Sequence, residues 1–221
     1  MMLKFMSRLF ILVPGILITW VSCSSQEKKL PILGYKDVKM VEQNGQAVAD
    51  TVYHTIADFR LRDQDSTWIT NETFRNKIYI ADFFFTTCPS ICPVMKAQML
   101  RIYEKFSEND NVQILSHTID PKHDSIPVLK EYSEKLEVSS SKWHFVTGAK
   151  DSIYTLGEKS YMVRAAEDQF APGGFIHSGA FALVDTERRI RGMYDGTREE
   201  DVDRLIRDIE ILLKEIEGAH E

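Results

Sequence analysis

The most regular pattern in the chain is an apolar run that changes abruptly into a helical repeat. Residues 78–85 (IYIADFFF) are β-branched or aromatic at nearly every position, which predicts a strand buried on both faces of a sheet. Pro89 and Pro93 restrict the residue before each of them, so residues 88–92 (CPSIC) are predicted to form a tight, irregular loop. A helix is then predicted to begin near Pro93, because apolar residues recur at helical spacing: Met95, Met99, Ile102 and Phe106.

Strands and helices alternate along the rest of the chain. The hydrophobic pattern predicts strands at 112–119 and 143–146, helices at 126–136 and 151–161, a strand pair at 179–184 and 190–194, and a long amphipathic helix at 199–217. Upstream, residues 58–65 suggest a short hairpin, and Asn44-Gly45 is a hairpin turn signal. This order predicts an α/β, thioredoxin-like fold, with a central mixed sheet flanked by helices and an N-terminal hairpin.

The first residues have the pattern of a targeting segment. Lys4 and Arg8 precede an apolar run at 9–21, which is short for a membrane span. Ser22 before Cys23 resembles a bacterial lipoprotein cleavage box, in which Cys23 becomes the lipid-bearing N-terminus. The alternative is an uncleaved signal anchor with an incidental Cys23. Both predict an exported, membrane-anchored protein, in the periplasm or on the outer face of the bacterial cell membrane, and both leave inner versus outer membrane open.

Domain organisation follows from these segments. The predicted divisions are a leader at 1–22, a tether and linker at 23–50, one folded domain at 51–217 and a tail at 218–221. Without the leader, which carries two of the 27 basic residues, the charge is 25 − 33 = −8. A net acidic chain without a basic run argues against nucleic acid as a partner.

Three cysteines are present, and if Cys23 carries lipid then Cys88 and Cys92 form a lone pair. One pair is not a disulfide framework, and a disulfide closing so short a loop would stabilise the fold little, which favours a pair kept for chemistry. Cys92 lies at the predicted start of a helix, whose dipole is expected to lower its pKa and favour the thiolate. A thiolate both binds soft metals and attacks disulfides.

Three motifs carry a family resemblance: 83–93 (FFFTTCPSICP), 119–121 (IDP) and 174–178 (GFIHS). They resemble the signatures of the Sco/SenC family, thioredoxin-fold copper proteins that take part in assembling cytochrome c oxidase, and the similarity covers roughly residues 54–215. The resemblance implies a copper site, Cu(I) or Cu(II), formed by Cys88, Cys92 and His177. Where the family commonly has an acidic residue between the cysteines, this chain has Ser90.

The remaining candidate side chains are interpreted as structural. His54, His117, His123, His144 and His220 are assigned no ligand role, and without the resemblance a lone His177 would be read in the same way. Helical spacing places Met95 and Met99 in the core rather than on a copper path. Asp120 could orient groups near the site or cap the next helix, and the structural role is favoured.

Two classes of function remain open from the sequence. The first is a tethered copper metallochaperone that delivers copper to subunit II of cytochrome c oxidase, with another copper carrier as a further conceivable partner. The second is a thiol–disulfide oxidoreductase, an enzyme acting on a partner's cysteine pair. Three residues between the cysteines and a dedicated histidine favour the chaperone over the enzyme, because redox thioredoxins use two intervening residues. A thiol peroxidase is less favoured because a separate resolving cysteine is lacking.

Overall fold

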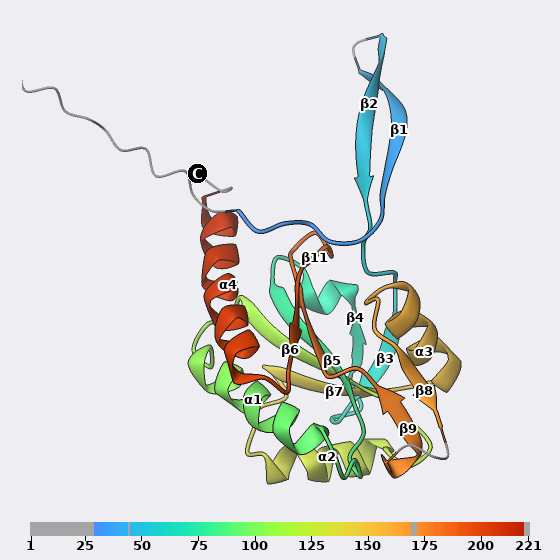
Figure 1. Cartoon of the computed structure of the whole chain (residues 1–221), viewed down its shortest axis with the longest axis vertical. Helices are drawn as coiled ribbons and strands as arrows, with labels where there is room; N and C mark the ends of the chain where they lie inside the picture. Colours follow the sequence, from blue (N-terminus) through green and yellow to red (C-terminus); the bar gives the residue numbers. More distant parts are fainter. Residues whose placement is uncertain (1–28, 44, 169–171, 219–221) are drawn as a thin grey trace, which may run out of the picture.

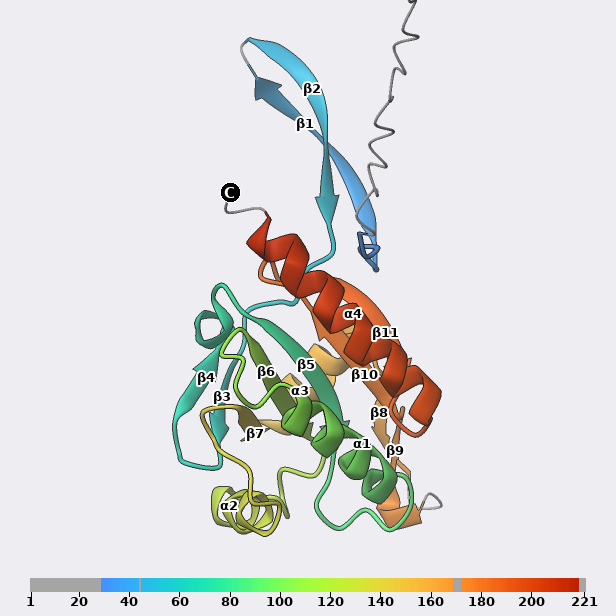
Figure 2. The same cartoon turned by 90° about the vertical axis from the view of Figure 1, so that its left-hand side faces the viewer.

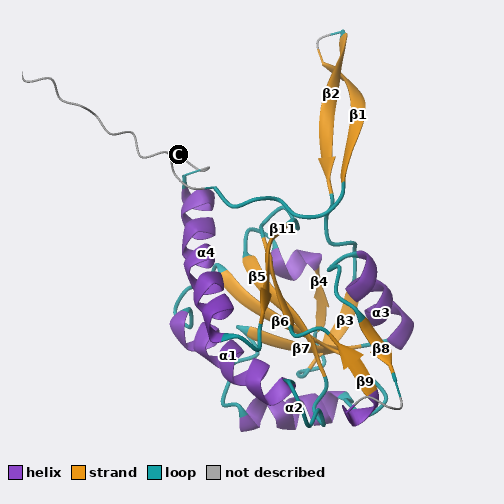
Figure 3. Cartoon of the chain, in the orientation of Figure 1, coloured by secondary structure: helices purple, strands orange, loops and turns teal. Residues whose placement is uncertain are grey.

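The computed structural model describes residues 29–43, 45–168 and 172–218, and places them around a seven-stranded mixed sheet (Figures 1 and 3). In chain order the strands are β1 Lys36–Gln43, β2 Gln46–Tyr53, β3 Arg60–Asp63, β4 Trp68–Thr70, β5 Ile78–Phe84, β6 Val112–Thr118, β7 Trp143–Thr147, β8 Ala165–Glu167, β9 Phe175–His177, β10 Ala180–Val184 and β11 Ile190–Asp195. The helices are α1 Cys92–Lys105, α2 Ile126–Lys135, α3 Lys150–Lys159 and α4 Glu199–Glu217, with 3₁₀ turns at Asn71–Phe74 and Pro172–Gly174.

The large sheet has the strand order β11-β10-β5-β6-β7-β3-β4. Its centre is parallel, β5 with β6 and β6 with β7, while β10, β11, β3 and β4 are joined by antiparallel pairing. Every residue of β5 and β6 is buried, because helices cover both faces of the central strands. The predicted thioredoxin-like, mixed α/β sheet is confirmed.

Helices cover the two faces unequally. From α2, Tyr132 packs on Phe84 and Phe145, on the same face that buries Met95 of α1. An Arg101–Asp203 ion pair links α1 to α4 on this side. On the opposite face, α3 packs its Gly157 against the ring of Phe83. Figure 2 shows the sheet between α1 and α4 in front and α3 behind.

Residues 36–53 form the N-terminal hairpin, which projects away from the rest of the molecule (Figures 1 and 2). Its eight-residue strands pair from Lys36↔Tyr53 to Gln43↔Gln46, in agreement with the predicted hairpin; of the predicted turn residues, Asn44 lies outside the described residues. The predicted linker therefore contains a regular hairpin. Upstream of it Leu30 is buried, and its carbonyl accepts a hydrogen bond from Arg191 at 2.6 Å.

Parallel strands place their carboxyl ends at one edge of the sheet, and this edge positions the cysteines. Cys88 lies in the loop that follows β5, and α1 begins at Cys92, one residue before the predicted start. Arg191, which anchors the Leu30 segment, lies at the opposite end of the sheet, because β11 runs antiparallel to β10 and β10 runs antiparallel to β5. The chain therefore enters the domain at the end remote from the cysteines. Among the described residues, no helix has the length and apolar character needed to cross a bilayer.

Candidate metal centre

Cys88 and Cys92 occupy the short connection between β5 and α1. After the strand ends, the N–H of Cys88 donates to the carbonyl of Phe85 at 3.2 Å, which closes a tight turn. Pro93 then occupies the first turn of α1, where its missing N–H leaves no bond unmade. The predicted irregular loop is confirmed, and both sulfurs are thiols rather than a disulfide.

The two thiols have different electrostatic environments. Burial opposes ionisation of Cys88, but hydrogen bonds from the Cys92 thiol and from the N–H groups of Ser90 and Cys92 outweigh it and lower the pKa of Cys88. Burial raises the pKa of Cys92 far above its ordinary value, and its hydrogen bond to Cys88 raises it further. Cys88 is 9% exposed and Cys92 is 5% exposed.

This asymmetry corrects the expectation that the helix N-terminus would make Cys92 the thiolate. Cys92 points into the core, where desolvation dominates the helix dipole, while Cys88 collects the hydrogen bonds that stabilise a negative charge. The Ser90 hydroxyl lies 3.7 Å from the Cys88 sulfur. A neutral hydroxyl therefore stands beside Cys88 at the position where the resembling family commonly has a carboxylate.

A buried carboxyl group beside Cys92 was missed by the sequence analysis. Asp82, within β5, lines a small space of about 10 Å³ together with Cys92, Met95 and Ser116. Burial raises the pKa of Asp82 to about 7, although the Ser116 hydroxyl donates a hydrogen bond to it. The available signal was a single charged residue within an otherwise apolar, fully buried strand.

His177 ends β9, and its backbone pairs with Ala165 of β8. Its side chain lies outside the described part of the structure, as do all atoms of Cys23 and His220. The described side chains alone contain no group of three metal-ligating residues. The predicted three-ligand set therefore stays a prediction. The structure locates only the backbone around His177.

The His177 segment (residues 173–179) contacts the cysteine loop (residues 85–91), both before and after the histidine. Before it, a Cβ placed on Gly173 would lie 2.8 Å from the Phe85 ring and 3.0 Å from Pro89. The rings of Phe85 and Phe175 are 4.9 Å apart between centroids. After it, Ser178 and Gly179 line one hollow together with Ile91. In both views β9 lies beside the loop that precedes α1 (Figures 1 and 2).

His117, His144 and Asp120 have structural contacts, although Asp120 supports the turn before α2 and does not cap that helix. His117 and His144 are buried within β6 and β7, and His144 bonds Asp63 at 3.3 Å. Met95 and Met99 are core residues. Asp120 accepts hydrogen bonds from the N–H groups of the turn that follows it, at residues 123 and 124.

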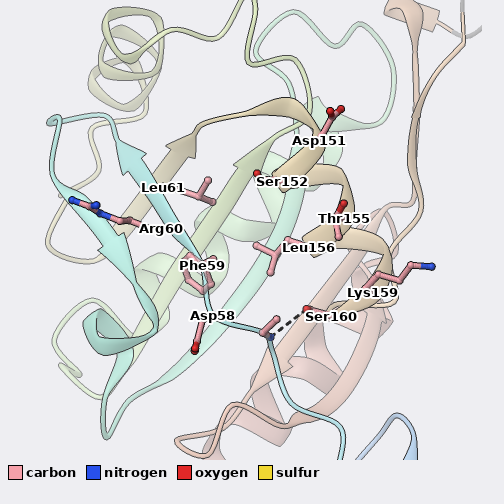
Figure 4. A pocket seen from close by; sticks show the side chains of 11 residues that line it. Asp58, Phe59, Arg60, Leu61, Asp151, Ser152, Thr155, Leu156, Lys159 and Ser160 are labelled. Carbon is pink, nitrogen blue, oxygen red and sulfur yellow. Dashed lines mark hydrogen bonds between the residues drawn. The ribbon is translucent and has the colours of Figure 1, made fainter.

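A larger hollow lies on the side of the sheet covered by α3 (Figure 4), and neither Cys88 nor Cys92 lines it. It measures about 470 Å³ and is lined by residues 57–61 and by α3, with the Ala57 N–H bonded to the Ser160 hydroxyl at 3.2 Å. Two of its charged groups have partners: Asp58 pairs with Arg188, and the Arg60 guanidinium stacks on Trp68. Arg60 and Lys159 extend away from the hollow in opposite directions (Figure 4), so it shows no convergent chemistry.

Comparison with known proteins places the geometry in a family. The SCO1/SenC family model matches residues 45–214. Many solved structures are similar to this chain, and three of them match over 71–72% of it as follows. A SCO1/SenC family lipoprotein from Bacillus anthracis has a TM-score of 0.66 at 26% identity, over 95% of its own chain. BsSco, described as having a disulfide switch and as a member of the Sco family of cytochrome c oxidase assembly proteins, has a TM-score of 0.64 at 28% identity, over 93% of its chain.

Yeast Sco1 with copper bound is the third, with a TM-score of 0.56 at 26% identity, over 89% of its chain. The family model spans β2, the cysteine loop, the His177 segment and most of α4. The chain therefore belongs to the SCO1/SenC family.

Proposed function

We propose that this protein is a membrane-tethered copper metallochaperone that binds copper through Cys88, Cys92 and His177 and takes part in assembling the copper centre of cytochrome c oxidase. The observation that carries the proposal is the placement of two adjacent thiols, one with a lowered pKa, beside the segment that ends in His177. Copper bound to yeast Sco1, and the oxidase assembly role named for BsSco's family, support the metal and the process.

The donor set fits a soft metal that must later be released. Thiolates and an imidazole suit copper, whereas hard cations prefer oxygen ligands. The lowered pKa of Cys88 supplies one thiolate readily, and copper binding would drive deprotonation of Cys92 because a metal-coordinated thiol loses its proton. Three protein ligands leave room for a donor from the acceptor protein, for which subunit II of the oxidase is our proposed partner.

The architecture supports a tether. The described chain enters the domain at the end of the sheet opposite the cysteines, where Leu30 and Pro31 are bound by Arg191. A lipid on Cys23 would thus hold the domain with its cysteine edge directed away from the membrane surface, on the periplasmic or outer face. The Bacillus anthracis relative is itself described as a lipoprotein.

Anaerobic copper titration of the reduced protein tests the ligand assignment. Wild type is expected to take up about one copper ion per chain, and Cys88→Ser/Cys92→Ser protein is expected to lose this uptake. Cys23→Ser is the matched control, since it removes a cysteine outside the site. This variant should bind copper normally but should no longer be found in the membrane fraction. Equal uptake by wild type and the double variant would contradict the proposal.

A second function, thiol–disulfide exchange with a partner's cysteine pair, is favoured by one specific observation. The pair combines a thiol of lowered pKa with a buried neighbour that donates a hydrogen bond to it, as expected of an attacking and a resolving thiol. The disulfide switch described for BsSco is consistent with such chemistry. Efficient turnover of a disulfide substrate by copper-free His177→Ala protein would favour this enzyme activity over transport.

A further inference from the structure

Asp124 is a fully buried carboxylate beside the cysteine loop, and neither proposed function uses it. Its Oδ2 accepts the Thr86 N–H at 3.1 Å and the Thr118 hydroxyl at 2.5 Å. Its Oδ1 bonds the Thr86 hydroxyl at 2.5 Å and His123 Nδ1 at 3.1 Å. A carboxylate offers about four lone-pair positions, so these contacts occupy its whole acceptor capacity.

These contacts join two loops at the carboxyl edge of the sheet. Thr86 is two residues before Cys88 and belongs to the connection between β5 and α1, whereas Thr118 ends β6. Asp124 itself ends the turn after β6, where its N–H bonds the Asp120 carbonyl at 2.9 Å. The residue therefore fixes the backbone through which the strand delivers Cys88, without offering a spare oxygen to a ligand.

We propose that Asp124 is a positioning residue for the Cys88–Cys92 pair: its bonds to Thr86 hold the cysteine loop in the open dithiol arrangement that accepts a metal. The copper part of this inference rests on the proposed function, whereas the effect on the thiols does not. Outer-shell groups that orient ligands are typically worth 10–100-fold in metal affinity. Releasing the loop lowers the fraction of protein in the binding-competent state and lets the sulfurs reach disulfide geometry more often.

Asp63 provides a matched control elsewhere in the sheet. It is also a buried carboxyl group, it accepts N–H groups of residues 65 and 67, and it also has a histidine partner, His144. It lies on β3, which is separated from β5 by β6 and β7. Replacing Asp63 by Ala reproduces the cost of losing a buried hydrogen-bonded carboxylate without touching the cysteine loop.

The experiment compares full-length wild type, Asp124→Ala, Asp124→Asn and Asp63→Ala in detergent. Two quantities are measured: copper affinity under anaerobic conditions, and the dithiol–disulfide equilibrium of Cys88 and Cys92 in metal-free protein, read by peptide mass spectrometry in redox buffers. Asp124→Ala is expected to weaken copper binding 10–100-fold. It is also expected to shift the equilibrium about tenfold toward the disulfide, which makes the reduction potential of the pair about 30 mV more negative.

Asp124→Asn should lie between wild type and Asp124→Ala, because its amide oxygen can still accept the Thr86 N–H. Asp63→Ala should match wild type in both measurements even if its stability falls. If Asp124→Ala does not fold, Thr86→Val, which removes one hydroxyl donor, must shift the equilibrium in the same direction by a smaller amount. Equal behaviour of the position-124 variants and Asp63→Ala overturns the inference. If wild type binds no copper, the proposed function fails, and the metal-free equilibrium alone decides the role of Asp124.

Discussion

The Cys92 thiol donates a hydrogen bond to Cys88, and this contact divides the pair into one thiol that ionises readily and one that is held protonated. Burial disfavours the charge on both sulfurs. At Cys88 the N–H donors of Ser90 and Cys92 help to outweigh burial, whereas at Cys92 the N–H donor of Phe85 does not. The same contact would favour both proposed functions, metal capture and disulfide exchange, because each begins with a thiolate.

The first prediction concerns the reactivity of the two thiols. In reduced, metal-free protein near neutral pH, Cys88 should be alkylated at least tenfold faster than Cys92, since the thiolate is the nucleophile and Cys92 is almost wholly protonated. Mass spectrometric mapping after brief exposure to iodoacetamide measures the ratio. Cys92→Ala should slow the alkylation of Cys88, because it removes a hydrogen bond that stabilises the Cys88 thiolate. Faster labelling of Cys92 than of Cys88 in wild type would contradict the assignment.

The second prediction concerns His177. His177→Ala should weaken Cu(II) binding more than Cu(I) binding, because the two thiolates dominate the site for the softer ion. Competition titrations with chelators specific for each oxidation state measure the two affinities. His54→Ala is a suitable control, since the His54 ring bonds the Ser160 carbonyl at 2.7 Å and lies outside the cysteine loop. Equal losses for Cu(I) and Cu(II) would argue against His177 as a ligand.

The third prediction uses two neighbouring glycines with positive φ. Gly173 (φ +76°) and Gly174 (φ +85°) both favour glycine, but only at Gly173 would a Cβ clash, against Phe85 and Pro89. Gly174→Ala should cost about 1 kcal/mol of stability from backbone strain. Gly173→Ala should cost about 1–3 kcal/mol, because it adds overpacking, and should also lower copper affinity by pushing the His177 segment off the loop.

Urea unfolding and copper titration of the two glycine variants separate these effects. The Gly174→Ala protein serves as the strain-matched control, since nothing lies within 4 Å of its added Cβ. Matching copper affinities in the two variants would show that the contact between Gly173 and the cysteine loop is unimportant for binding.

The fourth prediction concerns pH and two buried groups of opposite type. Burial lowers the pKa of His117 to about 4 from 6.5. Between these two pH values the unfolded chain binds a proton that the folded chain does not, so stability is lost as pH falls from 6.5 to about 4, by roughly 3 kcal/mol. Burial raises the pKa of Asp82 to about 7 from 3.8, so the folded chain binds the proton and stability is lost as pH rises, by roughly 4 kcal/mol. Between about pH 4 and 6.5 the two contributions oppose each other.

Replacing either group should therefore reveal the pH dependence of stability that the other group contributes. Relative to wild type, Asp82→Asn should become less stable as pH falls from 6.5 to 4.5, and His117→Phe should become more stable over the same range. Urea unfolding of reduced, metal-free protein at the two pH values gives the differences. Parallel pH profiles for wild type and both variants would contradict the protonation states assigned to the buried pair.

Local pattern in the sequence determined the strands, the helices and the irregular loop. The run at 78–85 is so apolar that it can only be buried, and the period after Pro93 fits a single helix face, so β5 and α1 formed where expected. These features depend on near neighbours in the chain, which is why they can be inferred without coordinates. The cysteine pair was visible for the same reason.

Tertiary structure decided the chemistry of that pair. Which thiol ionises depends on burial and on donors from several segments, and local reasoning about a helix dipole selected the wrong cysteine. The Asp124 carboxylate accepts a hydrogen bond from Thr86, which is 38 residues earlier in the chain. Asp82 lies beside Cys92 only because α1 packs back over β5. Desolvation and long-range hydrogen bonds depend on what surrounds a group in three dimensions, and a linear pattern does not contain that information.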